Sequence, residues 1–278
     1  MASSAVLAVL VAGVLVGPLI WRVPIDEIDF SARLATPSAA HPFGTDDLGQ
    51  DLLARMMYGG RISLAVGFAA MVVATVVGTV IGAVAGMSRR YLDPILMWIT
   101  DLFLSLPQLP LLLLVIYLFR DKLKAVFGVE GGVFVMIVVV IGGLRWMPVA
   151  RLVRAQFLSL REKEFVEAVR AMGASKWRQV VRHILPNALG PVIVAGTIDV
   201  AAAIIAESTL SFLGLGLPPD RASLGTLLQD ARAAVLTGSW WTLTFPALAL
   251  VVTTLAVAGA GAALRDRITP PLPERAVR

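Results

Sequence analysis

Few residues of this 278-residue chain could carry out chemistry. It has two histidines and no cysteine, which excludes a thiolate metal site and a cysteine nucleophile. The hydropathy pattern places His41 and His183 on opposite sides of a membrane, so one chain cannot form a two-histidine zinc site. No HExxH, GxSxG or Walker-type phosphate loop occurs in the sequence. We therefore expect no catalytic residue, no metal ligand and no cofactor bound by this chain, which cannot hydrolyse ATP by itself.

Four ionisable residues fall inside apolar runs, where a charge is expensive and usually has a function. Asp101 and Arg145 lie near the predicted cytoplasmic ends of their runs, so snorkelling or pairing accounts for them. Asp199 is the deepest of the four, and it either faces a water-filled pathway or is hydrogen-bonded between helices. Glu207 precedes a stretch of hydroxyl-bearing residues and glycines, which suits a gate or a scaffold equally. Asp199 and Glu207 are therefore the candidate pathway or gate residues.

A charged island at residues 155–187 separates long apolar segments. Its Ser-x-x-Glu sequence from Ser159 to Glu162 is a capping box, which predicts a helix beginning near Leu160. Gly173 should end that helix, because glycine accepts the left-handed conformation common after a helix C-terminus. The helix has an apolar stripe at helical spacing, made of Phe165, Ala168, Val169 and Met172.

A second short helix is predicted to follow in the island, with Ser175 as its N-cap and Pro186 as its end. Its apolar stripe consists of Trp177, Val180, Val181 and Ile184, and its basic face of Lys176, Arg178, Arg182 and His183. The island is therefore a pair of amphipathic helices. Such a pair could lie in lipid headgroups or dock on a soluble partner.

The composition is that of a membrane protein. Hydrophobic residues make up 58% of the chain and charged residues 15%, with a mean hydropathy of +0.82. The net charge of +5 fits basic cytoplasmic loops better than nucleic-acid binding. Six apolar runs are long enough to cross a bilayer, at residues 5–21, 62–87, 95–119, 133–152, 189–213 and 241–264. We expect an all-α polytopic protein, with a first helix and external segment (1–60), a transmembrane domain (61–266) and a tail (267–278).

Basic residues between the runs predict the orientation. Arg89, Arg90, the island and the tail lie on one side of the membrane and hold more Lys and Arg than the other side. Because cytoplasmic loops are enriched in these residues, we expect the island and both termini to face the cytoplasm.

Two features predict how the helices pack. Small residues recur every four positions in the second run, and they let another helix of this or another subunit approach closely. Pro107 and Pro110 should kink the third run. The small residues are Ala70, Ala74, Gly78, Gly82 and Gly86.

The island resembles the EAA loop of ABC importer permeases. Glu167-Ala168-Val169, Gly173 and Leu185-Pro186 match its spacing, although Val169 replaces the second alanine. Gly-Ala-Ser-x-Trp at 173–177 and Arg-His-Ile-Leu-Pro-Asn at 182–187 resemble the dipeptide, oligopeptide and nickel group more narrowly. Residues 41–51 (HPFGTDDLGQD), 60–64 (GRISL) and 207–216 (ESTLSFLGLG) are similar to the C-type permease of that group.

The resemblance implies a type I ABC importer permease in a prokaryotic cell membrane. Such a permease works by alternating access and is coupled to a cytoplasmic ATPase through the island. Its partners would be a homologous permease, two ATPase subunits carrying ATP and Mg, an external solute-binding protein, and lipid. The residues implied in coupling are Glu167, Ala168, Gly173, Ser175, Lys176, Trp177, Arg178 and Pro186.

Several alternatives remain open within and beside this resemblance. Peptides are the expected substrate, but nickel chelates, glutathione and opine-like solutes are carried by similar permeases. A secondary transporter or channel working without an ATPase is the alternative class. The external segments 25–58 and 217–239 are the expected docking surface for the binding protein.

Overall fold

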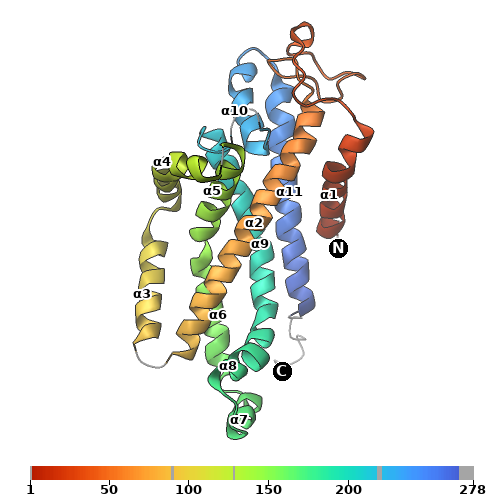
Figure 1. Cartoon of the computed structure of the whole chain (residues 1–278). Helices are drawn as coiled ribbons and strands as arrows, with labels where there is room; N and C mark the ends of the chain where they lie inside the picture. The colour runs from red at the N-terminus through yellow and green to blue at the C-terminus, as the bar shows by residue number, and fades with distance from the viewer. Residues whose placement is uncertain (1, 89–90, 128, 218–220, 269–278) are drawn as a thin grey trace, which may run out of the picture.

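A computed structural model describes residues 2–88, 91–127, 129–217 and 221–268 (Figure 1). Over these residues the chain consists of helices, turns and loops, with one isolated bridge between Thr45 and Asp51 and no strand. The predicted all-α class is confirmed. Arg89, Arg90 and residues 269–278 lie outside the described residues.

In chain order the helices are α1 (Ala2–Ile20), the 3₁₀ turn η1 (Phe30–Ala32), α2 (Leu52–Met87), α3 (Leu92–Ser105), α4 (Gln108–Phe127), α5 (Val129–Gly143), α6 (Trp146–Leu160), α7 (Glu164–Ala171), α8 (Lys176–Gln179), the π-helical turn η2 (Val180–Ile184), α9 (Leu185–Phe212), α10 (Leu224–Val235) and α11 (Trp240–Ile268).

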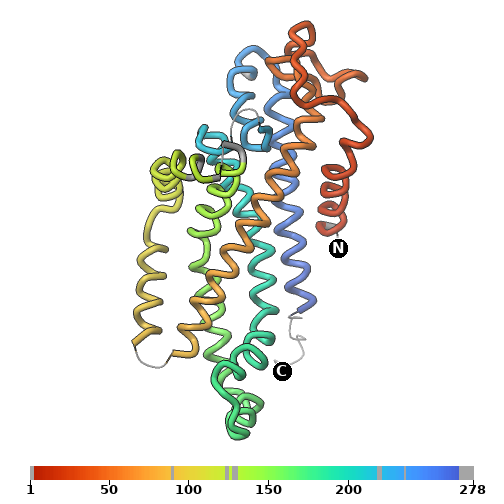
Figure 2. Tube along the Cα trace, viewed as in Figure 1, coloured from red at the N-terminus to blue at the C-terminus, as the bar shows by residue number. Residues whose placement is uncertain are grey.

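The six predicted apolar runs correspond to four unbroken helical segments and two bent pairs. Helices α1, α2 and α11, and the continuous segment Lys176–Phe212, are each long and apolar enough to cross a membrane. Helices α3 and α4 meet at 93°, and α5 and α6 at 44°. The chain is thus a multi-pass membrane protein. Figure 2 shows the loop between α1 and α2 at one end of the bundle and α7 at the other.

The small-residue stripe of α2 packs within the subunit, against α6. Added side chains at these glycines would meet α6 backbone at once: a Cβ on Gly82 would lie 2.4 Å from the Ala150 carbonyl oxygen. Gly78 faces the Trp146 carbonyl in the same way, and a Cβ on Gly86 would meet the Cβ of Phe157 at 2.5 Å. Close backbone approach maximises dispersion contacts where lipid removes the hydrophobic driving force between helices. The stripe therefore fixes α6, and through it α7, relative to the centre of the bundle.

The break between α3 and α4 is sharper than the predicted kink. Pro107 disfavours helical geometry for the residue before it, and Leu106 accordingly has an extended ψ of 140°. The α3 helix therefore ends at Ser105, and α4 restarts after Pro107 in a nearly perpendicular direction. Pro110 lies in the first turn of α4, where its missing N–H is tolerated.

The break between α5 and α6 faces the first one. Arg145 joins the two helices with φ −123° and ψ 3°, outside helical geometry. Pro148 has no N–H to offer the Leu144 carbonyl four residues earlier. Gln108, at the start of α4, donates its side-chain Nε2 to that carbonyl at 3.4 Å. The two helix breaks are therefore joined side by side.

A proline also shapes how α1 is attached. Pro18 leaves the Val14 carbonyl without its usual donor inside the helix. Arg61 of α2 donates its Nε to that carbonyl and its Nη2 to the Leu15 carbonyl, both at 2.7 Å. Otherwise α1 is largely exposed along its length, so this contact is its main polar attachment to the bundle.

The island folds differently from its predicted boundaries. Helix α6 continues to Leu160, so Ser159 lies inside it and the predicted capping box does not form. Helix α7 begins instead at Glu164, after Lys163 in an N-cap position without a side-chain hydrogen bond. Gly173 ends α7 with φ +80°, as predicted. The capping-box prediction was wrong because the apolar face of α6 continues through it.

The second island helix starts as predicted but does not end as predicted. The Ser175 hydroxyl accepts a hydrogen bond from the Arg178 N–H at 3.3 Å and caps α8. Pro186 does not stop the helix: it lies in the first turn of α9, directly after the π-helical turn η2. In a π-turn each hydrogen bond spans five residues instead of four, here from the Leu185 N–H to the Val180 carbonyl. The segment therefore continues unbroken into the membrane.

Candidate functional site: the α7–α8 coupling surface and the buried polar groups

Helices α7 and α8 project from the end of the bundle opposite the α1–α2 loop (Figure 1). A single side chain, Val166, anchors α7: it is fully buried in a cluster with Phe157 of α6, Ile184 of η2 and Ala188 of α9. Sequence reasoning missed Val166 because it lies off the predicted apolar stripe. Its signal was weak, since Val166 lies between Phe165 and Glu167 and only Val169 joins it on that side of α7.

Four large apolar residues of the two predicted stripes, Phe165, Met172, Trp177 and Val181, are exposed, whereas Ile184 is buried. Trp177 is 76% exposed, Met172 78% and Phe165 41%, so three large apolar groups point away from the subunit. Glu167 and Ala168 of α7 are exposed on the same unit. Of the other predicted coupling residues, Gly173, Ser175, Lys176, Arg178 and Pro186 are also exposed. Exposed large apolar groups beside charged ones are typical of an interaction surface.

The turn between α7 and α8 is held by short-range hydrogen bonds. The Gly173 N–H donates to the Arg170 carbonyl at 3.0 Å, and the Ala174 N–H to the Val169 carbonyl at 3.3 Å. The buried side chain of Gln179 then donates to the Ala174 carbonyl at 2.8 Å. A turn closed in this way lets the two helices move as one body.

Basic side chains surround the base of this unit. Arg161 donates to the Gly86 carbonyl at 3.0 Å, which ties the end of α6 to the end of α2. Together with Arg170 and Lys176 it lines a cavity of about 390 Å³ between the island and α2. The predicted basic character of this end is thus present in three dimensions.

Each of three charged residues in apolar runs has an ionic partner on another helix. Arg145 and Asp199 bond across the bundle, with Nη2 and Oδ1 2.5 Å apart. Asp101 pairs with Arg151 of α6. The pairing expected for Arg145 and Asp101 is therefore present, but Arg145 is deeper than predicted, because its partner lies halfway along α9.

Glu207 is the fourth, and it is completely buried. Its carboxylate accepts hydrogen bonds from Ser211 at 2.7 Å and from Ser63 of α2 at 3.0 Å. The Ser63 oxygen also accepts from the Leu224 N–H at the start of α10, at 3.2 Å. Hydrogen bonds to a carboxylate in a dry interior are strong, so Glu207 joins α2, α9 and α10.

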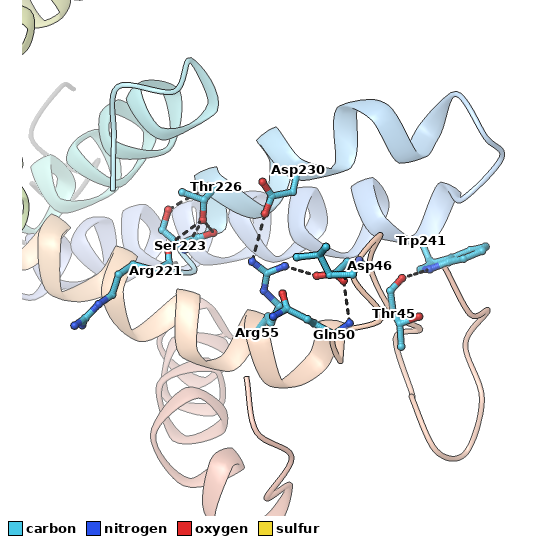
Figure 3. Close-up of polar contacts among 10 residues, drawn as sticks. Thr45, Asp46, Gln50, Arg55, Arg221, Ser223, Thr226, Asp230 and Trp241 are labelled. Carbon is cyan, nitrogen blue, oxygen red and sulfur yellow. Dashed lines mark hydrogen bonds and ion pairs between the residues drawn. The ribbon is translucent and has the colours of Figure 1, made fainter. Parts of the chain in front are cut away.

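The end opposite α7 is closed by a second polar network (Figure 3). Arg55 of α2 pairs with Asp46 of the α1–α2 loop and, at 3.3 Å, with Asp230 of α10. Burial raises the pKa of Asp230, and the Arg55 charge opposes that shift without cancelling it. The Trp241 indole N–H donates to the Thr45 carbonyl at 3.1 Å. The loop, α10 and α11 therefore form one unit.

Comparison with known structures agrees with this arrangement. The fold is similar to a subunit in inward-facing conformations of the MetNI methionine ABC transporter, with a TM-score of 0.60, 20% identity, and 78% of this chain and 96% of that chain covered. This chain therefore shares its fold with that subunit.

Comparison of sequences defines the family. The profile described as "binding-protein-dependent transport system inner membrane component" matches residues 78–270. The chain belongs to this family.

Three similar relatives span almost its whole length. The oligopeptide transport system permease protein OppC of Mycobacterium tuberculosis is 36% identical, over 97% of this chain and 89% of the relative. A putative peptide permease protein of Brucella suis is 42% identical, over 94% and 83%. The dipeptide transport system permease protein DppC of Bacillus subtilis is 36% identical, over 98% and 82%.

Proposed function

We propose that this chain conducts dipeptides or oligopeptides into a prokaryotic cell as the permease subunit of an ATP-driven ABC importer. The named function of its full-length relatives supports a peptide substrate. Nickel chelates, glutathione and opine-like solutes are the alternative substrates. The complete complex would add a homologous permease, two ATPase subunits that bind ATP and Mg, and an external solute-binding protein.

Coupling to the ATPase takes place at the α7–α8 unit. The observation that carries this proposal is the contrast between Val166, fully buried against α6 and α9, and Trp177 and Met172, exposed on the outside. The unit is thus fastened to two membrane helices while it presents an apolar surface. Glu167 would meet a basic group on the ATPase, and Lys176 and Arg178 acidic ones.

The external end is proposed to receive the binding protein. Residues 25–58 and 217–239, of which 218–220 lie outside the described residues, surround the Arg55 network at this end (Figure 3). The α7 end and both termini would then face the cytoplasm. Movement between inward-open and outward-open states would connect the two ends.

The test is uptake by the reconstituted complex in vesicles. We expect trialanine uptake that requires ATP, and Glu167→Lys should abolish it while leaving membrane insertion unchanged. Uptake that persists in vesicles lacking ATP and any ATPase subunit would instead establish a secondary transporter. Mass spectrometry of the complex purified from its native membrane identifies its partners and any ligand on the binding protein.

A further inference from the structure

The two helix breaks bring a charged pair into the middle of the bundle. Arg145 stands at the α5–α6 break, beside the start of α4. Its partner Asp199 lies at the midpoint of α9. In membrane proteins, non-helical backbone at this depth is tolerated where it is covered by protein or lines an aqueous cavity. Arg145 lines a cavity of about 120 Å³, together with Phe103, Gln108 and Met147.

The pair leaves hydrogen-bonding groups unused on both residues. Arg145 directs both Nε and Nη2 at one oxygen, Oδ1 of Asp199, at 2.7 and 2.5 Å. Among the described residues, the other oxygen, Oδ2, is buried and has no hydrogen-bond partner. The hydroxyl of Thr75, against Gly196 one turn of α9 before Asp199, is also buried without a partner among them. Buried polar atoms of this kind call for an explanation, such as a water or a ligand group that supplies the hydrogen bond.

A neighbouring pair shows the arrangement expected of a purely structural link. Arg154 of α6 contacts both oxygens of Asp93 in α3, Nε to Oδ1 at 2.5 Å and Nη2 to Oδ2 at 2.7 Å. This two-pronged geometry uses the planar guanidinium fully. The Arg145–Asp199 pair does not, although it is more deeply placed, where every unused group costs more.

We propose that Arg145 and Asp199 bind the two charged ends of a peptide as it crosses the membrane, Arg145 the carboxylate and Asp199 the ammonium group. This inference rests on the proposed function. A zwitterionic peptide and the Arg145–Asp199 pair both have zero net charge. When the peptide binds, the one pair is replaced by two, Arg145 with the peptide carboxylate and Asp199 with its ammonium group, so every buried charge keeps a partner. The free Oδ2 accepts the ammonium group. The cavity beside Arg145 has room for one end group of the peptide.

The first test asks whether this region meets water during transport. The chain has no cysteine, so Leu144→Cys, in the cavity lining, gives a single thiol for a cationic, membrane-impermeant methanethiosulfonate reagent. In the reconstituted complex we expect labelling of this thiol to differ between nucleotide-free and vanadate-trapped states and to slow with trialanine. Leu255→Cys, 67% exposed on α11, is the membrane-embedded control and should stay unlabelled. A Leu144→Cys thiol unlabelled in both states would overturn the proposal.

The second test measures selectivity for the charged ends. The double variant Arg145→Gln with Asp199→Asn removes both charges, so no unpaired charge remains to prevent folding. We expect its preference for trialanine over N-acetyl-trialanine amide to be about tenfold or more below that of the wild type, because charged hydrogen bonds are lost. Both complexes use the same binding protein, so its own preference cancels from this ratio.

The outcomes separate the two proposals. An unchanged preference, or an equal loss of both peptides, means that the pair is a structural link and overturns this inference alone. A wild-type complex without ATP-dependent uptake of either peptide would refute peptide import itself, whereas the labelling of Leu144→Cys would still report whether the region lies in a pathway.

Discussion

Gly173 provides a test of the proposed coupling surface, because two possible reasons for a glycine can be separated there. One is its left-handed backbone conformation, and the other is the room that its missing side chain leaves for a partner. Gly173 has φ +80°, and a Cβ built there would have no atom of the other described residues within 4 Å, apart from its two neighbours in the chain. Within the subunit, therefore, a substitution changes only backbone strain. Alanine in the left-handed region costs about 1–2 kcal/mol, valine more because its branched Cβ is poorly tolerated there, and asparagine least.

These strains set the expected loss of coupling. A penalty of about 1–2 kcal/mol lowers the population of the native turn by up to about 5- to 30-fold. The bonds from Gly173 to Arg170 and from Gln179 to Ala174 resist rearrangement, so this is an upper limit. Substrate-stimulated ATP hydrolysis by the reconstituted complex should therefore fall partly in Gly173→Ala, further in Gly173→Val, and little in Gly173→Asn.

The pattern among the three variants decides the reasoning. Ala171→Val adds bulk two residues earlier on helical backbone, and it should retain coupling. If Gly173→Asn is as damaging as Gly173→Val, the position is required for space against the ATPase and the backbone argument is wrong. Wild-type activity in Gly173→Val would show that the turn conformation is not needed at all.

Three further predictions concern other parts of the fold. Glu167→Lys should reduce co-purification of the ATPase subunits, whereas Glu164→Lys, an equal charge change on the same exposed helix, should affect it less; equal losses would argue against a specific contact. Gly82→Val should prevent α2–α6 packing, because its Cβ would meet a carbonyl oxygen at 2.4 Å, while Gly13→Val, with open space around its Cβ, should yield normal amounts of monodisperse protein. Asp230 has a folded-state pKa raised above 3.8, so its contribution to stability is greatest below that pH and is lost as pH rises through the raised pKa; thermal unfolding of Asp230→Asn should lack this part of the pH dependence, and parallel curves would contradict the shift.

Local sequence rules predicted the features of the island that local geometry controls. Gly173 and Ser175 act through their own backbone and their nearest neighbours, so a left-handed residue and an N-cap were both found. Ser159 carries an equally good local signal, but the helix before it is held by long-range packing of Phe157 and continues through it. Tertiary packing therefore sets the end of α6, and a local sequence pattern cannot predict such packing.

The polar residues in the membrane show the same limit. An ionisable residue in an apolar run was recognisable as unusual, but the depth of Arg145 depends on the break at α5 and α6, and its partner is far away in sequence. Pro107 indicated the break between α3 and α4. The other lies at Arg145, where the nearest proline, Pro148, is inside α6 and not between the helices, and the joining of the two breaks by Gln108 required the folded chain.

The contact between Arg61 and α1 has a consequence for biogenesis. During synthesis α1 emerges before α2, and Pro18 leaves the Val14 carbonyl without a donor in a medium that offers no water. Arg61 follows at the start of the next span and is itself costly to leave alone in lipid. Each segment therefore has an unsatisfied polar group that the other one satisfies, and in the folded subunit the Arg61 Nε lies 2.7 Å from the Val14 carbonyl oxygen. Helices α1 and α2 should therefore enter the bilayer as a helical hairpin. Until α2 has been translated, α1 should be only weakly stable in the membrane.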